Sequence, residues 1–278
     1  MAIVTFWSNG REETAKTLSI AAIATHMAIE HNYKILVVST AYRDNTLETC
    51  YWEPRNQELI EEIAGKKKDV SEGIDGLVKL ALSNKITPSM VTNYTRLVFP
   101  DNRLEVLSGS NSENYSDYEK IRESYKDVIK SASEFYDIVF IDLSKGLESE
   151  NIREVLEISD LVVVNLTQRL KLINDFQKIR DEYPMFKKDN VMLLLGRYDK
   201  FSKYTAKNIA RMIGERRPIS VIPYCTLFFE ACNEGKTADF FLRFRNLDPT
   251  DRNAVFIDEV KQSADAIIGR LREMRFRL

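Results

Sequence analysis

A lysine and a threonine stand side by side after the first apolar run of the chain, where a strand would give way to a helix. They close the segment Gly10-Arg11-Glu12-Glu13-Thr14-Ala15-Lys16-Thr17, which matches the phosphate-binding pattern G-x-x-x-x-G-K-[S/T] except that Ala15 replaces the second glycine. In such a loop backbone N–H groups and a helix N-terminus surround a phosphate, the lysine reaches the outer oxygens and the hydroxyl binds Mg²⁺. An ordinary strand-to-helix turn with a capping threonine would explain the octapeptide equally well.

A carboxylate ends another apolar run. Asp142 follows Ile138–Ile141 and is itself followed by Leu143-Ser144-Lys145-Gly146. An acid at the carboxyl end of a central strand faces the crevice in which doubly wound sheets bind their ligands. We therefore expect Lys16, Thr17 and Asp142 to lie together, with Thr17 binding Mg²⁺ directly and Asp142 holding it through water.

Short, continuous apolar runs supply the strands that would position these groups. They are Ile3–Trp7, Ile35–Val38, Leu104–Leu107, Ile138–Ile141, Leu161–Val164, Val191–Leu195 and Ser220–Ile222. Segments with helical periodicity lie between and after them, at Ala15–His31, Ser116–Glu134, Asn151–Ile158, Lys171–Glu182, Lys203–Ile213 and Leu227–Asn233. Strands without alternation are buried on both faces, so this order predicts an α/β fold with a doubly wound, mostly parallel sheet and helices on both faces. We expect residues 1–278 to form one domain, with irregular helical decoration over about 45–100 and a terminal helix over about 253–276.

The composition excludes several classes of protein. The 278 residues are 44% hydrophobic and 29% charged, which indicates a globular chain with a core. A net charge of −2 and a pI near 5.9 argue against a coat for nucleic acid. The 3 cysteines form no C-x-x-C pair, which argues against a disulfide framework or a zinc ribbon and favours a cytoplasmic location. No apolar stretch approaches the roughly 20 residues of a membrane span.

In their order and spacing, four motifs resemble the ParA/MinD family of deviant Walker A P-loop ATPases, which includes TadZ-like proteins. The motifs are the loop at 10–17, the strand end at Asp142, Leu195-Gly196-Arg197-Tyr198-Asp199, and Val221-Ile222-Pro223. The resemblance covers most of the chain from Ala2 to about Thr237 and is weakest over 45–100. It implies a P-loop NTPase-like fold, ATP or ADP with Mg²⁺ as cofactors, a homodimer, and protein partners of a positioning or assembly system.

The resemblance also implies roles for particular residues. Nucleotide-binding residues would be Gly10, Arg11, Ala15, Lys16, Thr17 and Leu18 in the loop, and Arg197, Asp199 and Pro223 near the base. Arg11 falls where the family has a lysine that crosses the dimer interface to the partner's ATP, although an ordinary surface arginine remains the alternative. An aspartate at position 199 can accept a hydrogen bond from adenine or guanine, so base identity stays open.

The chain departs from the family at several catalytic positions. Glu12 and Glu13 would repel a polyanion, and Ala15 would be strained if its φ is positive. Ser39 and Ala41 stand where the family has the aspartates of the first switch, one of which orients the attacking water. Asp44 could substitute from a displaced loop, or be a solvated turn aspartate. With Lys16, Arg11, Asp142 and Asp44 as the candidate catalytic set, we expect a slow ATPase at most.

The end of the chain is rich in arginine. Arg270, Arg272, Arg275 and Arg277 follow an apolar stripe, which predicts a final helix packed on the sheet with its cations at the C-terminal end. Contact of this tail with a membrane or with DNA is the alternative, and membrane contact would place the protein at the inner membrane face. The sequence thus favours a ParA/MinD-like purine-nucleotide-binding protein with weak or absent hydrolysis, acting as a dimerising positioning or assembly factor. The alternatives are a pseudo-ATPase scaffold that no longer binds nucleotide and a DNA-partitioning ATPase.

Overall fold

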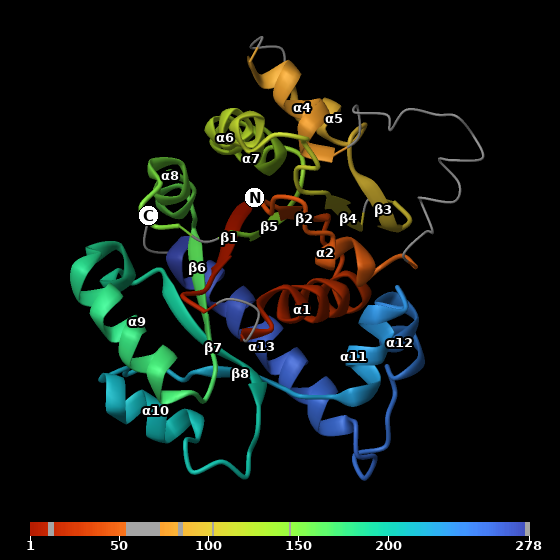
Figure 1. Cartoon of the computed structure of the whole chain (residues 1–278). Helices are drawn as coiled ribbons and strands as arrows, with labels where there is room; N and C mark the ends of the chain where they lie inside the picture. Colours follow the sequence, from red (N-terminus) through yellow and green to blue (C-terminus); the bar gives the residue numbers. More distant parts are fainter. Residues whose placement is uncertain (11–13, 54–72, 83–85, 102, 145, 276–278) are drawn as a thin grey trace.

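Eight strands form one sheet in the order β3-β4-β2-β5-β1-β6-β7-β8 (Figure 1). The computed structural model describes the chain except residues 11–13, 54–72, 83–85, 102, 145 and 276–278. The strands are β1 (Ala2–Trp7), β2 (Ile35–Ser39), β3 (Arg96–Phe99), β4 (Leu104–Leu107), β5 (Ile138–Asp142), β6 (Leu161–Leu166), β7 (Val191–Tyr198) and β8 (Ser220–Pro223). Every pairing is parallel except that of β3 with β4, so the expected doubly wound, mostly parallel α/β sheet is confirmed.

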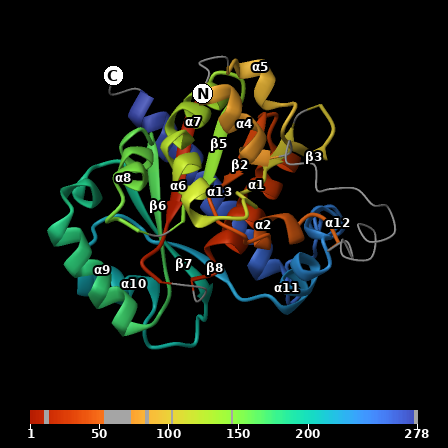
Figure 2. The same cartoon turned by 45° about the horizontal axis from the view of Figure 1, so that its top comes forward.

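Helices cover both faces of the sheet (Figure 2). One face carries α1 (Lys16–Glu30), α2 (Thr46–Thr49), α11 (Thr226–Asn233), α12 (Thr237–Arg243) and α13 (Ala254–Arg275). The other carries α4 (Gly73–Leu82), α5 (Pro88–Val91), α6 (Tyr115–Glu123), α7 (Tyr125–Ser133), α8 (Glu150–Glu157), α9 (Leu170–Glu182), the 3₁₀ turn η2 (Pro184–Lys187) and α10 (Ala206–Ile213). In the described parts of the chain, no helix combines the length and the apolar character needed to cross a membrane.

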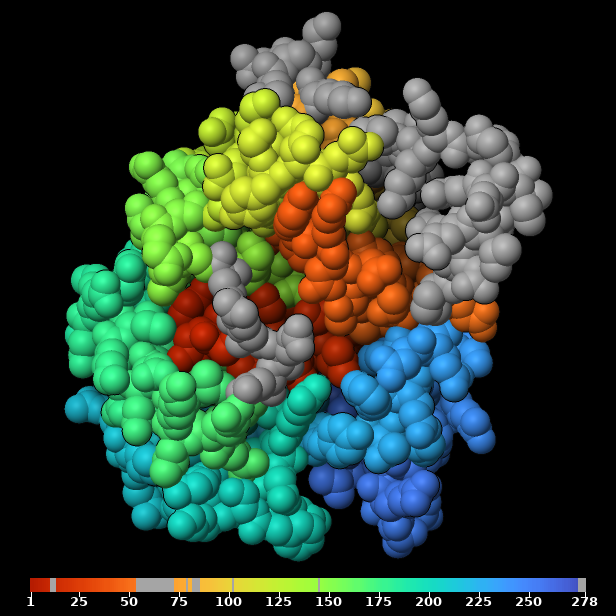
Figure 3. Space-filling model, in the orientation of Figure 1, coloured from red at the N-terminus to blue at the C-terminus, as the bar shows by residue number. Residues whose placement is uncertain are grey.

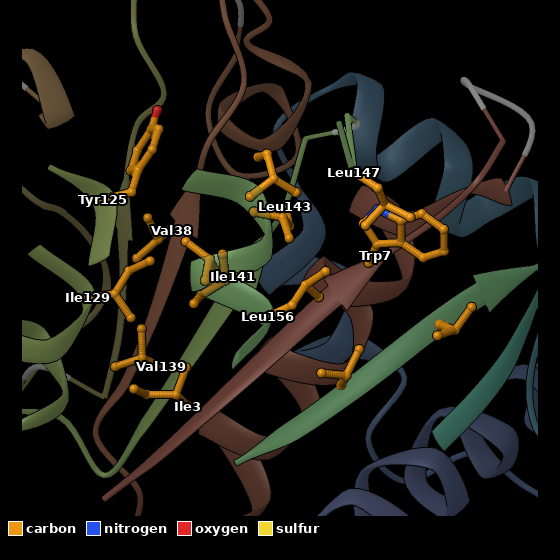
Figure 4. Packing of buried hydrophobic residues seen from close by; sticks show 14 of the residues in the cluster. Ile3, Trp7, Val38, Tyr125, Ile129, Val139, Ile141, Leu143, Leu147 and Leu156 are labelled. Atoms are coloured by element: carbon orange, nitrogen blue, oxygen red, sulfur yellow. The ribbon is translucent and has the colours of Figure 1, made fainter. Parts of the chain in front are cut away.

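Alternate residues of the central strands pack into two separate hydrophobic cores, one on each face of the sheet. On β1, Ile3 and Trp7 pack under the α7 and α8 side, whereas Val4 and Phe6 pack under α1. Figure 4 shows the first core, where Val139 and Ile141 of β5 lie close to Ile129 of α7. Because both faces of the strands are buried, their sequences read as unbroken apolar runs.

The segment predicted to be helical decoration contains a strand as well as helices. β3 pairs antiparallel with β4 at the edge of the sheet, so residues 96–99 are a strand and not part of the irregular helical decoration expected over about 45–100. The four residues of β3 are exposed or half-buried, which is the pattern of an edge strand and not of the buried strands elsewhere. The helical stretch expected over 116–134 is divided into α6 and α7 at Ser124.

The terminal helix packs on the sheet as expected. α13 lies against β8 and α1, and the Ser263 hydroxyl donates to the carbonyl oxygen of Val221 at 3.3 Å. Its buried stripe contains Phe256, Val260 and Ala264. The helix thereby covers one face of the sheet over β8 and β6.

Candidate functional site

The loop after β1 enters α1 through a residue in the left-handed region. Ala15 has φ 49° and ψ 36°, so the strain expected if its φ were positive is present. The carbonyl of Ala15 accepts hydrogen bonds from the backbone N–H and the hydroxyl of Ser19, each at 2.9 Å. This geometry turns the chain sharply into α1. In the space-filling view of Figure 3, the N-terminal part of the chain (red) lies at the centre of the face shown, among the orange, green, teal and blue parts.

A glycine on β7 makes room for the same loop. A Cβ on Gly196 would lie 2.1 Å from the carbonyl oxygen of Thr14, far inside contact distance. The backbone of the loop therefore rests directly on β7, and a side chain at position 196 would displace it. The residue after it, Arg197, has a positive φ of 50° and lies where the register with β8 shifts, between Gly196 and Tyr198.

Lys16, Thr17 and Asp142 meet in one cluster. Asp142, the last residue of β5, is in register with Phe6 of β1 and Ser39 of β2. Its Oδ1 lies 2.7 Å from the Lys16 ammonium nitrogen, and its Oδ2 accepts a hydrogen bond from the Thr17 hydroxyl at 2.6 Å. The Lys16 ammonium also donates to the backbone carbonyl of Leu143. The structure thus places together the three residues that the sequence singled out.

The charges of this cluster compensate one another. The side chains of Lys16 and Asp142 are 15% and 9% exposed, so each needs a partner of opposite sign to offset the cost of leaving water. The pair meets that need inside the protein. A polyanion approaching the loop would compete with Asp142 for the lysine, and the carboxylate so released would be available to a metal ion.

Hydrogen bonds tie the end of β2 to the end of β5. The Thr40 hydroxyl donates to the carbonyl of Asp142 at 3.2 Å and accepts from the Ser144 N–H at 2.7 Å. The Tyr118 hydroxyl of α6 donates to the carbonyl of Thr40 at 2.8 Å. On either side, Ser39 is buried, and Ala41 contacts the loop after β4, where the Ser110 N–H donates to its carbonyl. The positions where acids were expected belong to a closed network of hydroxyl and backbone groups.

A small hollow lies on the other side of the loop. Its lining includes Ala15 and Leu18 at the start of α1, Arg197 after Gly196, and Pro223 at the end of β8, together with the aromatic side chains of Tyr224, Phe228, Phe229 and Phe256. Its volume is about 20 Å³, which is room for a water molecule and not for a purine ring. An aromatic or heterocyclic ring would enter here only after Tyr224, which is 56% exposed, and its neighbours move aside.

The remaining predicted site residues lie apart from the cluster or outside the described residues. Asp44 is exposed, and its carboxylate accepts from the Thr46 N–H at 2.9 Å at the start of α2. The Asp199 carboxylate accepts from the Phe201 N–H at 2.9 Å within its own loop. Gly10 donates its N–H to the Ser8 hydroxyl at 3.1 Å. Arg11, Glu12 and Glu13 fall outside the described residues.

Glu48 on α2 is an acid that sequence reasoning passed over. Burial raises the pKa of its carboxyl above the usual value of 4.5, partly offset by hydrogen bonds from its own backbone, Ser108 and Gly109. Leu47 precedes it on α2, and Cys50 caps the C-terminal end of the helix; both are buried. The sequence feature that could have indicated this buried acid is a glutamate that stands between apolar residues, Leu47 and Cys50, soon after β2.

Solved structures of three related proteins share this arrangement of strands and helices. A ParA family ATPase from Chlorobium tepidum TLS superposes with a TM-score of 0.68 at 19% identity, covering 92% of this chain and 96% of that one. The septum site-determining protein MinD of Pyrococcus horikoshii OT3, complexed with Mg-ADP, gives 0.63 at 18%, covering 97% and 98%. A chain of the MinC:MinD cell division protein complex of Aquifex aeolicus gives a TM-score of 0.66 at 14% identity, covering 97% and 96%.

Sequence comparison alone finds no relative. No family model matches the chain, and no curated protein does. The likeness therefore rests on the path of the backbone over nearly the whole length of both chains. By its sheet order, its helices and the loop after β1, this chain has the ParA/MinD-like P-loop fold.

Proposed function

We propose that this protein binds a purine nucleotide with Mg²⁺ at the loop of residues 10–17 and turns it over slowly or not at all. The observation that carries the proposal is the cluster of Lys16, Thr17 and Asp142, in which a cation, a hydroxyl and a carboxylate meet at the N-terminus of α1. A helix N-terminus with a lysine beside it is a phosphate site on physical grounds. One protein of the same fold is a ParA family ATPase, and another, a MinD protein, is complexed with Mg-ADP.

The side-chain atoms of Lys16, Thr17 and Asp142 fit both the phosphates of a nucleotide and Mg²⁺. The Thr17 hydroxyl and the Asp142 carboxylate are hard oxygens 2.6 Å apart, and oxygen ligands are those that Mg²⁺ prefers. Thr17 would hold the metal directly and Asp142 through water, while Lys16 would turn from Asp142 to the β and γ oxygens. When bound, the metal would supply charge neutralisation on the phosphates.

Slow turnover follows from what surrounds the γ-phosphate position. Phosphoryl transfer depends on a group that orients the attacking water and on cations that stabilise charge. Ser39 and Ala41 provide no acid there, and Asp44 is engaged with Thr46. Nucleotide would therefore act mainly as a structural ligand that assembles a homodimer, in which Arg11 reaches the partner's nucleotide.

The biological role we propose is that of a positioning or assembly factor of the TadZ-like kind, in the cytoplasm. One structure of the same fold is a MinC:MinD cell division protein complex, which supports the proposal that this chain also binds a protein partner. We also propose that residues 1–278 act as a single domain. Basal hydrolysis on the order of one turnover in many minutes would fit this role.

Binding is tested by isothermal titration with ATP, ADP and GTP, with and without Mg²⁺. We expect a dissociation constant below the millimolar range that depends on Mg²⁺ and is lost in Lys16→Ala. Lys126→Ala is the matched control, because it removes another lysine from an ion pair, the one between α7 and α8 that Lys126 forms with Glu154 at 2.9 Å. Equal loss in both variants, or a wild-type protein that binds none of the three nucleotides, would exclude the proposal.

A scaffold without nucleotide is the second candidate. It is favoured by the ion pair of Lys16 with Asp142 at 2.7 Å, which satisfies the lysine without a phosphate, and by the small hollow on the base side. A third outcome, an efficient ATPase, is tested by measuring phosphate release from the wild type. Turnover near one per second that is abolished by Lys16→Ala would show that Asp44 or Arg11 supplies the missing catalytic group.

A further inference from the structure

The connection between β7 and α10 presents an aromatic side chain to solvent. Residues 199–205 form this loop, which projects at the lower edge of the molecule in Figure 1. Phe201 near its tip is 86% exposed, more than any other large hydrophobic side chain among the described residues. Leaving a phenylalanine in water forgoes the free energy of burial, which contact with a partner surface would recover.

Hydrogen bonds fix the shape of this loop. The Gln168 side chain, after β6, donates to the carbonyls of Asp199 at 2.9 Å and Tyr204 at 2.8 Å, and accepts from the Asp199 N–H at 2.8 Å. At the other end the Asn208 side chain donates to the carbonyl of Lys203 at 2.8 Å. Hydrogen bonds therefore fix both ends of the loop, and Phe201 lies between them with its side chain exposed to solvent.

Cations surround the aromatic tip. Residues 197–211 contain five Lys or Arg and one acidic residue, Asp199, whose carboxylate is turned inward onto the Phe201 N–H. The Lys200 ammonium lies 5.2 Å from the Phe201 ring and the Lys203 ammonium 5.1 Å from the Tyr204 ring. Lys200, Lys203 and Lys207 are exposed, and none is in an ion pair with a described carboxylate.

We propose that this loop docks on a membrane surface that contains anionic lipid. Phe201 enters the boundary between headgroups and acyl chains, while Lys200, Lys203 and Lys207 meet the lipid phosphates. An apolar tip inside a ring of cations is complementary to such a surface. The backbone of duplex DNA offers the phosphates but no apolar region for a rigid, outward phenylalanine. The surface is separate from both the Lys16 cluster and the arginine-rich tail, so the proposal does not depend on nucleotide.

Co-sedimentation of the full chain without nucleotide tests this surface. We expect binding to vesicles of phosphatidylcholine containing phosphatidylglycerol, at low salt, and little binding to phosphatidylcholine alone. Phe201→Ser should lower lipid affinity about tenfold or more. Leu242→Ser is the matched control, since Leu242 is a 52% exposed apolar residue on α12, and it should bind as the wild type does.

The lysines are tested in the same way. Lys200→Gln combined with Lys203→Gln should weaken binding about 25-fold, because each lysine near an anionic surface contributes a factor of about five. Lys34→Gln is the control, because the Lys34 ammonium also lies beside a ring, 5.0 Å from that of Phe135, away from this loop. All variants should keep the wild-type unfolding temperature, since these side chains are exposed.

Insertion has its own readout. In Phe201→Trp the additional tryptophan emission should shift to shorter wavelength with anionic vesicles and be quenched by brominated lipid. The proposal is overturned if the wild type binds no vesicles, if Phe201→Ser binds undiminished, if neutral and anionic vesicles bind equally, or if the new tryptophan stays in water. Retention on duplex DNA that depends on the lysines and ignores Phe201 would also overturn it, and would make the loop a nucleic-acid surface.

Discussion

Replacing Ala15 with glycine should stabilise this protein, although the same change in most helices destabilises. Ala15 sits at φ 49° and ψ 36° directly before α1, a conformation that costs an L-residue about 1–2 kcal/mol. Glycine removes that cost but gives the unfolded chain more freedom, worth about 0.4–1 kcal/mol. The difference is a net gain of about 0.5–1 kcal/mol in the free energy of unfolding.

Urea denaturation followed by circular dichroism measures this gain as a higher midpoint at an unchanged slope. The unfolding temperature should rise by about 1–2 °C for a chain of this length. Ala266→Gly is the control: Ala266 lies inside α13 and is absent from the residues with positive φ, so glycine there should cost about 1 kcal/mol. If Ala15→Gly lowers the midpoint as Ala266→Gly does, Ala15 is not left-handed in solution and the reasoning about this loop fails.

Three further changes probe the fold and its charges. Burial raises the pKa of Glu48 above 4.5, so the wild type loses stability as pH rises above about 4.5; Glu48→Gln should unfold at higher urea at pH 7 and lose that advantage near pH 4. Burial lowers the pKa of His26 below 6.5, so the unfolded chain takes up the proton first and stability falls as pH drops below about 6.5; a pH series in His26→Gln should show a flatter decline. A Cβ on Gly235, which has φ +72°, would lie 2.2 Å from the backbone of Trp52, whereas Gly214, with φ +67°, has open space. Calorimetry should therefore show a larger loss of unfolding temperature for Gly235→Ala than for Gly214→Ala, and equal losses would mean that the contact with Trp52 is absent.

The sequence predicted the parts of the fold that rest on burial. Continuous apolar runs identified the seven parallel strands, because both of their faces lie under helices. β3 escaped notice because its four residues are exposed or half-buried, so it lacks the burial on both faces that marks the other strands. The break at Ser124 between α6 and α7 also follows from packing and not from a breaker residue.

The candidate site, like the fold, could be predicted from the sequence only in part. The spacing of Lys16 and Thr17 and the position of Asp142 at a strand end predicted that they would meet. Their direct pairing depends on side-chain geometry across 125 residues, which no local pattern contains. The Thr40 hydroxyl, which joins β2 to β5, and the Gln168 clamp are likewise single polar groups whose partners lie far along the chain.

The central place of β1 bears on how the chain folds as it is made. β1 leaves the ribosome first, yet its two neighbours are β5, at 138–142, and β6, at 161–166. At about 5–20 residues per second, roughly 8–30 s pass between the synthesis of β1 and that of the end of β6. Throughout that interval a buried-type strand has unpaired edges in the nascent chain. Its native pairing is therefore a late event, and until β5 and β6 are made, α1 is the element that directly follows β1 and can cover one of its faces.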